Sequence, residues 1–166
     1  MNETWENDFL ESLKKLFSES GMEIEIVDYN GQKALEIVHN GANDGDDTTI
    51  LVEHIFNDTT QIRIIESVFS EIDDDCAQKL RTVISWLNQN LCMGCFVLSN
   101  EGDYLYYNYS FEITEDMDAP IIMDILGQTL GIIGETIREG IEILTPLMNG
   151  EKSIDEMLNS NIAILQ

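Results

Sequence analysis

The order of its helical and strand-like segments constrains this chain of 166 residues more than any single motif does. Apolar residues recur at helical spacing, then alternate with polar residues over four short runs, return to helical spacing, alternate twice more and end in a long helix. Adjacent short strands joined by turns pair as hairpins. The order therefore predicts an α+β fold whose mostly antiparallel sheet has about six strands, with helices packed against it.

The expected elements follow from this periodicity. Helices are predicted over residues 4–20, from the acids at 73–75 to about residue 91, and over residues 120–148. Strands are predicted over residues 22–28, 33–39, 48–56, 61–70, 95–99 and 103–111. Asn30-Gly31 suits a tight hairpin turn, Asp73–Asp75 suit a helix N-terminus, and Ser153 with Glu156 forms a capping box. We expect one domain over residues 1–166, with a short helical extension in 149–166.

The chain is strongly acidic, with 32 Asp and Glu residues against 8 Lys and Arg residues and a net charge of -24. Such a surface repels phosphate backbones, which argues against nucleic-acid binding. The apolar stretch Ala119–Ile137 is interrupted by charged and polar residues, so no membrane span is predicted. The first residues lack a basic region, and we expect a cytoplasmic location.

Three cysteines fit a reducing compartment better than a disulfide framework. Cys92 and Cys95 have redox-motif spacing, but they follow a helix and enter a strand, whereas redox motifs begin a helix. We expect the cysteines to be buried as small apolar residues. The loop Asn40–Asp47 is acidic, but it does not fit the calcium-loop pattern. No metal site is predicted.

Three glycines, Gly127, Gly131 and Gly134, line one face of the long predicted helix. A glycine costs about 1 kcal/mol relative to alanine inside a helix, so three on one face suggest a close backbone approach. The approach is either to the sheet of the same chain or to a partner helix, and a homodimer is one form of the second alternative.

The last hairpin is rich in tyrosine. Tyr104 and Tyr106 share one face of its second strand, and Tyr107 and Tyr109 share the other. One face is explained by cross-strand packing, and an exposed tyrosine face would suit protein recognition. All four are candidates for contact with a partner.

The stretch Leu80–Phe111 carries a more specific pattern. Leu87-Asn88 ends a helix, a short strand follows Gly94, and the acidic turn Glu101-Gly102-Asp103 leads into the tyrosine-rich strand. With the order of elements, this pattern resembles the YbjN-like family, which is described as candidate sensory transduction regulators of bacteria. The resemblance implies a fold similar to the type III secretion chaperones, which are small, acidic and cytoplasmic. It implies no catalytic residue and no cofactor.

These features favour a non-enzymatic cytoplasmic module, chaperone-like or regulatory, that holds another polypeptide, expected to be basic. One alternative is an acidic inhibitor, either an immunity protein or a nucleic-acid mimic, that blocks a basic partner. A second is a small-ligand sensor. Chance pairs of acids are expected among 32, and neither a nucleophile elbow nor a phosphate-binding glycine loop is present, so no catalytic residue is predicted.

Overall fold

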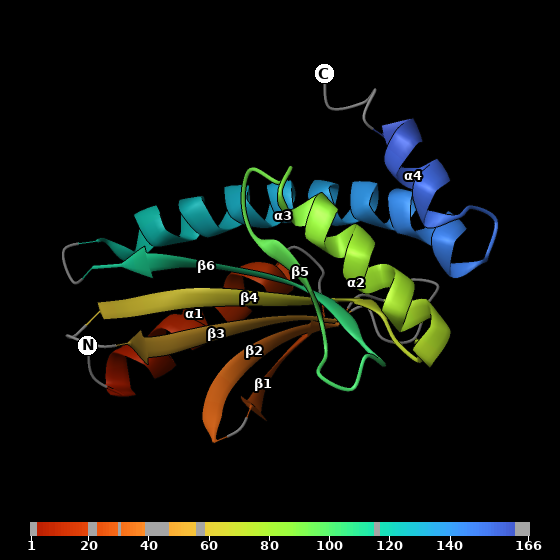
Figure 1. Ribbon diagram of the computed structural model, residues 1–166. Coiled ribbons are helices and arrows are strands. Elements are labelled where there is room, and N and C mark those ends of the chain that lie inside the picture. The colour runs from red at the N-terminus through yellow and green to blue at the C-terminus, as the bar shows by residue number, and fades with distance from the viewer. Residues whose placement is uncertain are drawn as a thin grey trace. The chain divides into compact units, whose positions relative to one another are not determined.

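The computed structural model describes residues 3–19, 23–29, 31–38, 47–55, 59–114 and 117–161 (Figure 1). The chain forms two compact units, of which the first comprises residues 1–67 and 108–130 and the second residues 68–107 and 131–166. Their boundaries fall inside β4 (Thr59–Phe69), β6 (Leu105–Ile113) and α3 (Ala119–Met148). A single domain over residues 1–166 stays a prediction. The loop Asn40–Asp47 lies outside the described residues, except for Asp47.

The first unit begins with α1 (Glu3–Glu19), β1 (Glu23–Tyr29), β2 (Gln32–Val38) and β3 (Asp47–Ile55). β1 pairs antiparallel with β2, β2 with β3, and β3 with β4. The predicted tight turn is confirmed at Gly31, which has a φ of 86° and donates its N–H to Asp28 Oδ1 at 2.8 Å. Gly31 adopts this φ without the steric cost that a side chain would bring.

The core of the first unit lies where α1 packs against β1 and β2. In the register of the sheet Leu35 is opposite both Ile26 and Ile50, and Ile50 is opposite Ile64. Directly opposed residues share a face of a sheet, so one face is continuously apolar. The buried residues of this unit include Phe9, Leu10, Leu13, Phe17, Ile24, Leu35, Ile37, Ile50, Ile62 and Ile64.

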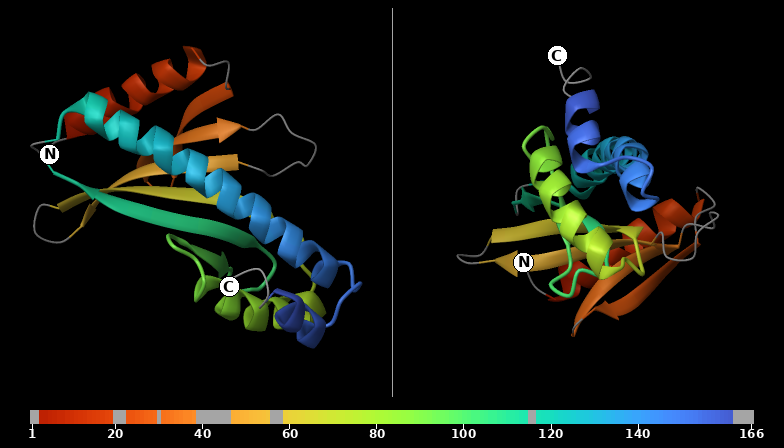
Figure 2. Two further views of the ribbon diagram at one scale, coloured as in Figure 1. Left: turned by 90° about the horizontal axis from the view of Figure 1, so that it is seen from above. Right: turned by 45° about the vertical axis from the view of Figure 1, so that its right-hand side comes forward.

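The second unit contains α2 (Asp74–Asn88), β5 (Cys95–Leu98) and α4 (Ile154–Asn161). α2 packs against β5 and against α4 (Figure 2). The predicted capping box begins α4, because Ser153 N–H donates to Glu156 Oε2 at 2.9 Å and Glu156 N–H donates to Ser153 Oγ at 3.3 Å. The Ser153 backbone N–H, and after it the Ser153 hydroxyl, which donates to Glu156 Oε2 at 2.7 Å, lower the pKa of Glu156.

Hydrogen bonds join the strands in the order β1-β2-β3-β4-β6-β5. The α+β class, the antiparallel pairing of β1 to β4 and the long helix α3 are confirmed. Among the described residues α3, over Pro120–Met148, is long and apolar enough to cross a membrane by length and composition. One stripe of α3 is buried, with Leu126, Ile133, Ile137 and Leu144 at most 4% exposed, which is the pattern of an amphipathic helix packed on one side.

Candidate functional site

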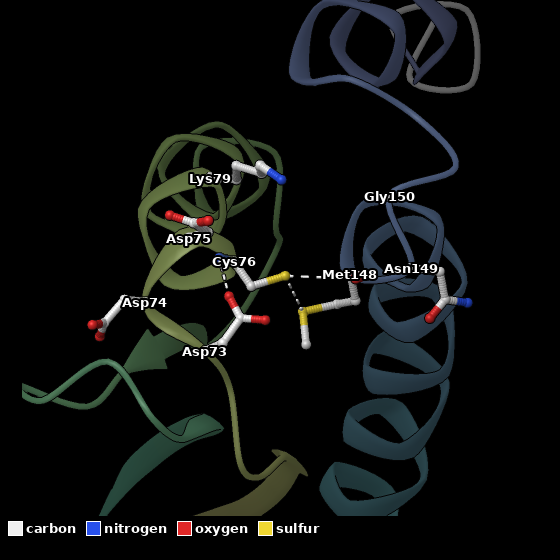
Figure 3. Close-up of a pocket in the computed structure, with 8 residues that line it drawn as sticks. All are labelled: Asp73, Asp74, Asp75, Cys76, Lys79, Met148, Asn149 and Gly150. Carbon is white, nitrogen blue, oxygen red and sulfur yellow. Dashed lines mark hydrogen bonds between the residues drawn. The ribbon is translucent and has the colours of Figure 1, made fainter.

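The second unit has an open hollow of about 600 Å³ where α2 begins and α3 ends (Figure 3). Its lining consists of three carboxylates, one thiol, one ammonium and the last turn of α3. The lining residues are Asp73, Asp74, Asp75, Cys76, Lys79, Met148, Asn149 and Gly150.

The three aspartates of this hollow serve the start of α2. Asp73 is the N-cap, and its Oδ1 accepts a hydrogen bond from the backbone N–H of Cys76 at 2.8 Å. Asp74 and Asp75 occupy the first turn, where negative charge stabilises the helix dipole. The predicted capping role is confirmed. Among the described residues no three His, Cys, Asp or Glu side chains are grouped to hold a metal ion.

Cys76 is 6% exposed, and its Sγ lies 3.6 Å from the Met148 carbonyl oxygen and 3.7 Å from Met148 Sδ (Figure 3). Burial, followed by the negative charge of Asp73, raises the pKa of the Cys76 thiol. A thiol at a helix N-terminus is usually activated, but the raised pKa keeps this one protonated and weakly nucleophilic.

Cys92 and Cys95 differ from this buried cysteine. Cys92 is exposed and Cys95 is half-buried, and both are free thiols. The prediction that the cysteines are buried is correct for Cys76 and wrong for Cys92. The reason is that Cys92 lies in the turn after α2, ahead of the strand that enters the core.

The aromatic centre of the second unit is built on Phe96 and Tyr107. Their rings meet edge to face at 5.1 Å, and the Tyr107 hydroxyl donates a hydrogen bond to the Met93 carbonyl oxygen. A Cβ on Gly140 would lie 2.3 Å from Phe96 Cζ, and a Cβ on Gly94 would lie 2.2 Å from the Tyr107 hydroxyl oxygen. Two glycines thus make room for two aromatic rings.

Asn88 closes this centre from the end of α2. Its Oδ1 accepts the backbone N–H of Phe96 at 2.8 Å, and its Nδ2 donates to the Phe96 carbonyl oxygen at 2.9 Å. One side-chain amide therefore satisfies both backbone polar groups of a residue in the short strand β5, as a neighbouring strand would. This contact gives a physical reason for the Leu87-Asn88 pair of the family resemblance.

The four candidate tyrosines have different environments. Tyr107 is fully buried, so its predicted contact with a partner is wrong, because its ring fills the core beside Phe96. The other three are half-buried. Tyr104 and Tyr106 lie with ring centroids 6.1 Å apart, and Tyr109 lies 6.2 Å from Phe111. Each of these three rings therefore lies beside another aromatic ring of the same segment, and part of each ring stays accessible.

The three predicted glycines lie on the exposed face of α3. A Cβ on Gly127, Gly131 or Gly134 would meet no other atom within 4 Å. Close packing against the described residues is therefore not the reason for these glycines. The same helix exposes Ile121 and Ile132, each 51% accessible, which with Tyr29 are the large apolar residues that stay exposed in the described part of the chain. We call the set of Gly131, Ile132 and Gly134, which all belong to the second unit, the outer face of α3.

Comparison with known proteins gives a likeness of fold. No family model and no curated protein matches the chain. Among solved structures, YbjN from E. coli, described as a candidate transcription regulator, is 15% identical with a TM-score of 0.50, over 78% of this chain and 89% of that one. An uncharacterized protein from Methanothermobacter thermautotrophicus is 18% identical with a TM-score of 0.45, over 86% and 98%. With the helix and strand order above, the match to YbjN shows that the chain has a YbjN-like fold.

Proposed function

We propose that the protein is a non-enzymatic cytoplasmic module, chaperone-like or regulatory, that binds another polypeptide. The observation that carries this proposal is the outer face of α3, where open glycines and an exposed isoleucine lie on the solvent side of one helix. Glycines let a second backbone approach closely, and exposed apolar side chains supply area to bury on binding.

The energetic argument compares glycines of one helix. Each costs about 1 kcal/mol relative to alanine, so Gly127, Gly131 and Gly134 together cost roughly 3 kcal/mol. At Gly140 the cost is offset by the packing of the Phe96 ring, for which a Cβ would leave no room. At the three exposed glycines no described atom of the chain uses the space. A partner that packs on this face would explain why they are there.

Charge indicates the kind of partner. The chain carries -24 overall, and the exposed side of α3 carries Asp124, Glu135, Glu139 and Glu142. Its one arginine, Arg138, is paired with Glu135 at 2.6 Å and with Glu142 at 3.0 Å. We therefore propose a basic polypeptide rather than nucleic acid, a membrane or a second copy, which would bring like charges together.

The likeness to YbjN supports the proposal only through the fold. YbjN is described as a candidate transcription regulator, which fits a module that acts through contact with another protein. We further propose that the sheet is a single one of six strands and that the fold is like that of the secretion chaperones. The raised pKa of the Cys76 thiol and the capping role of Asp73 support a non-enzymatic function.

The test is capture of the partner by tagged protein at low and at moderate salt, with identification by mass spectrometry. Gly131→Leu fills the outer face where no atom lies within 4 Å, so the fold should survive, as circular dichroism would show. Ser85→Leu is a matched control, because Ser85 is an exposed residue of another helix, α2. We expect one stoichiometric partner that withstands moderate salt, is lost with Gly131→Leu and is retained with Ser85→Leu.

Other results would favour the alternatives. A basic partner that is lost as salt rises, whether or not Gly131 is replaced, would support the acidic inhibitor, because charge-driven binding is screened by salt. A chain that captures no polypeptide under either condition would contradict the proposal and favour the small-ligand sensor.

A further inference from the structure

Among the described strands β1 lies at an edge, because β2 is the one strand to which it is hydrogen-bonded. Its pairing with β2 is regular over seven residues, from Glu23 opposite Val38 to Tyr29 opposite Gln32, with no bulge. Exposed edges are usually protected by charged side chains, proline, a bulge or short length. β1 is seven residues long with neither proline nor bulge, so its protection comes from its exposed acids, whereas β5 has four residues.

The charge on β1 is entirely negative. Glu23, Glu25 and Asp28 are exposed, and the strand contains no Lys or Arg. Glu25 lies directly opposite Glu36 of β2. Like charges in directly opposed positions destabilise a sheet. Repulsion within this pair therefore lowers the stability of the isolated protein, and a cation placed beside the two carboxylates would restore that stability.

The two faces of β1 differ in chemistry. Glu23 and Glu25 project from one face, and Ile24 and Ile26 project from the other, where Ile24 is buried. Since α1 packs against β1 and β2, a strand added beside β1 would extend this partly covered apolar face. A complementary strand would alternate basic and apolar residues.

We propose that the β1 edge binds an extended basic segment of a polypeptide by strand addition, with Lys or Arg at every second position facing Glu23 and Glu25. Backbone hydrogen bonds to β1 supply affinity, and the alternating side chains supply specificity. This inference rests on the proposed function, because it assigns a second surface for a polypeptide. A second copy of the chain fits poorly, since pairing of β1 with β1 would bring acids against acids.

The test uses a seven-residue peptide that alternates Lys and Val. A second peptide has the same sequence and charge, but its backbone nitrogens are methylated at alternate residues to remove the outward donors. Binding is followed by hydrogen exchange of the β1 amides and by titration. We expect the first peptide to bind and to protect β1, and the methylated peptide to bind at least tenfold more weakly.

Matched variants separate strand addition from simple charge attraction. Glu25→Lys places a cation on the edge and beside Glu36, and we expect at least a tenfold loss of peptide affinity. Glu11→Lys makes the same change of charge on an exposed position of α1, and we expect less than a twofold effect. Equal binding of the methylated peptide, or equal effects of the two variants, would overturn the proposal.

The outcome is distinguishable from that of the proposed function. Gly131→Leu leaves β1 unchanged, so the peptide should bind this variant as tightly as it binds the unaltered protein. If the peptide fails to protect β1 while a captured partner still depends on Gly131, this inference fails and the proposed function stands. Protection of β1 that rises with protein concentration in the absence of peptide would assign the edge to a second copy and would also overturn the inference.

Discussion

Gly140→Ala should destabilise the protein, although the same substitution is favourable in most helices. Alanine gains about 1 kcal/mol of helix propensity. The new Cβ would lie 2.3 Å from Phe96 Cζ and 3.0 Å from Phe96 Cε1 and Cε2, so the ring must move. Phe96 is 1% exposed and lies against Tyr107, so it has little space to move into. Overpacking costs about 3 kcal/mol at the upper end of its usual range, which gives a net loss of about 2 kcal/mol.

The assay is chemical denaturation of three alanine variants beside the unaltered protein. Gly131→Ala and Gly134→Ala are matched controls on the same helix with open space at the Cβ, and each should stabilise the protein by about 1 kcal/mol. Phe96→Leu combined with Gly140→Ala removes the obstructing ring, so the two substitutions together should cost less than the sum of their separate effects. Gly140→Ala with stability equal to or above that of Gly131→Ala would refute the reasoning.

Three further predictions concern the second unit. Asn88→Leu removes two hydrogen bonds to the β5 backbone, each of which contributes about 1 kcal/mol. The free energy of unfolding, measured by denaturant titration, should therefore fall by about 2 kcal/mol. An unchanged unfolding midpoint would contradict the role of Asn88 in holding β5. In the native protein a thiol reagent should modify Cys92 rapidly and Cys76 only on unfolding, because Cys76 is buried and the pKa of its thiol is raised. Comparable rates of modification at Cys92 and Cys76 would show that the hollow is more open than described. The lowered pKa of Glu156 means that its contribution to α4 is fully present above the ordinary glutamate value of about 4.3 and is lost as pH falls through the lower folded value. Ser153→Ala removes the hydroxyl but keeps the backbone N–H donor, so it should reduce this pH dependence without abolishing it, which NMR titration of the α4 amides would detect. An unchanged pH dependence would exclude a contribution from the Ser153 hydroxyl.

Local pattern accounts for most of what the sequence predicts correctly. The helices, the strands and the caps at Asp73 and Ser153 depend on neighbours within a few residues, so spacing and capping chemistry suffice. The reasons for particular glycines depend on distant contacts. The sequence pattern does not single out Gly140. It does single out Gly127, Gly131 and Gly134, for close approach either to the chain's own sheet or to a partner helix, and no described atom fills the space at these three glycines. The phase of the helix was the available signal, since Gly140 falls between the buried Ile137 and Leu144.

Burial on a strand is similarly a property of the whole fold. Alternation places Tyr107 and Tyr109 on one face, yet Tyr107 is fully buried and Tyr109 is only half-buried. What separates them is their neighbours, because Phe96 and the Met93 carbonyl oxygen enclose the Tyr107 ring. Likewise, no local signal reveals that the Asn88 amide pairs with the backbone of a strand eight residues later.

The interleaving of the two units has a consequence for synthesis on the ribosome. The first unit requires residues 108–130 and the second requires residues 131–166, so neither is complete until most of the chain has emerged. β4 ends at Phe69, and its neighbour β6 begins at Leu105. At about 5–20 residues per second, the edge of β4 that pairs with β6 therefore remains without its partner for seconds. Nascent chains in that state are prone to associate, and repulsion among their many carboxylates would keep neighbouring chains apart until β6 arrives.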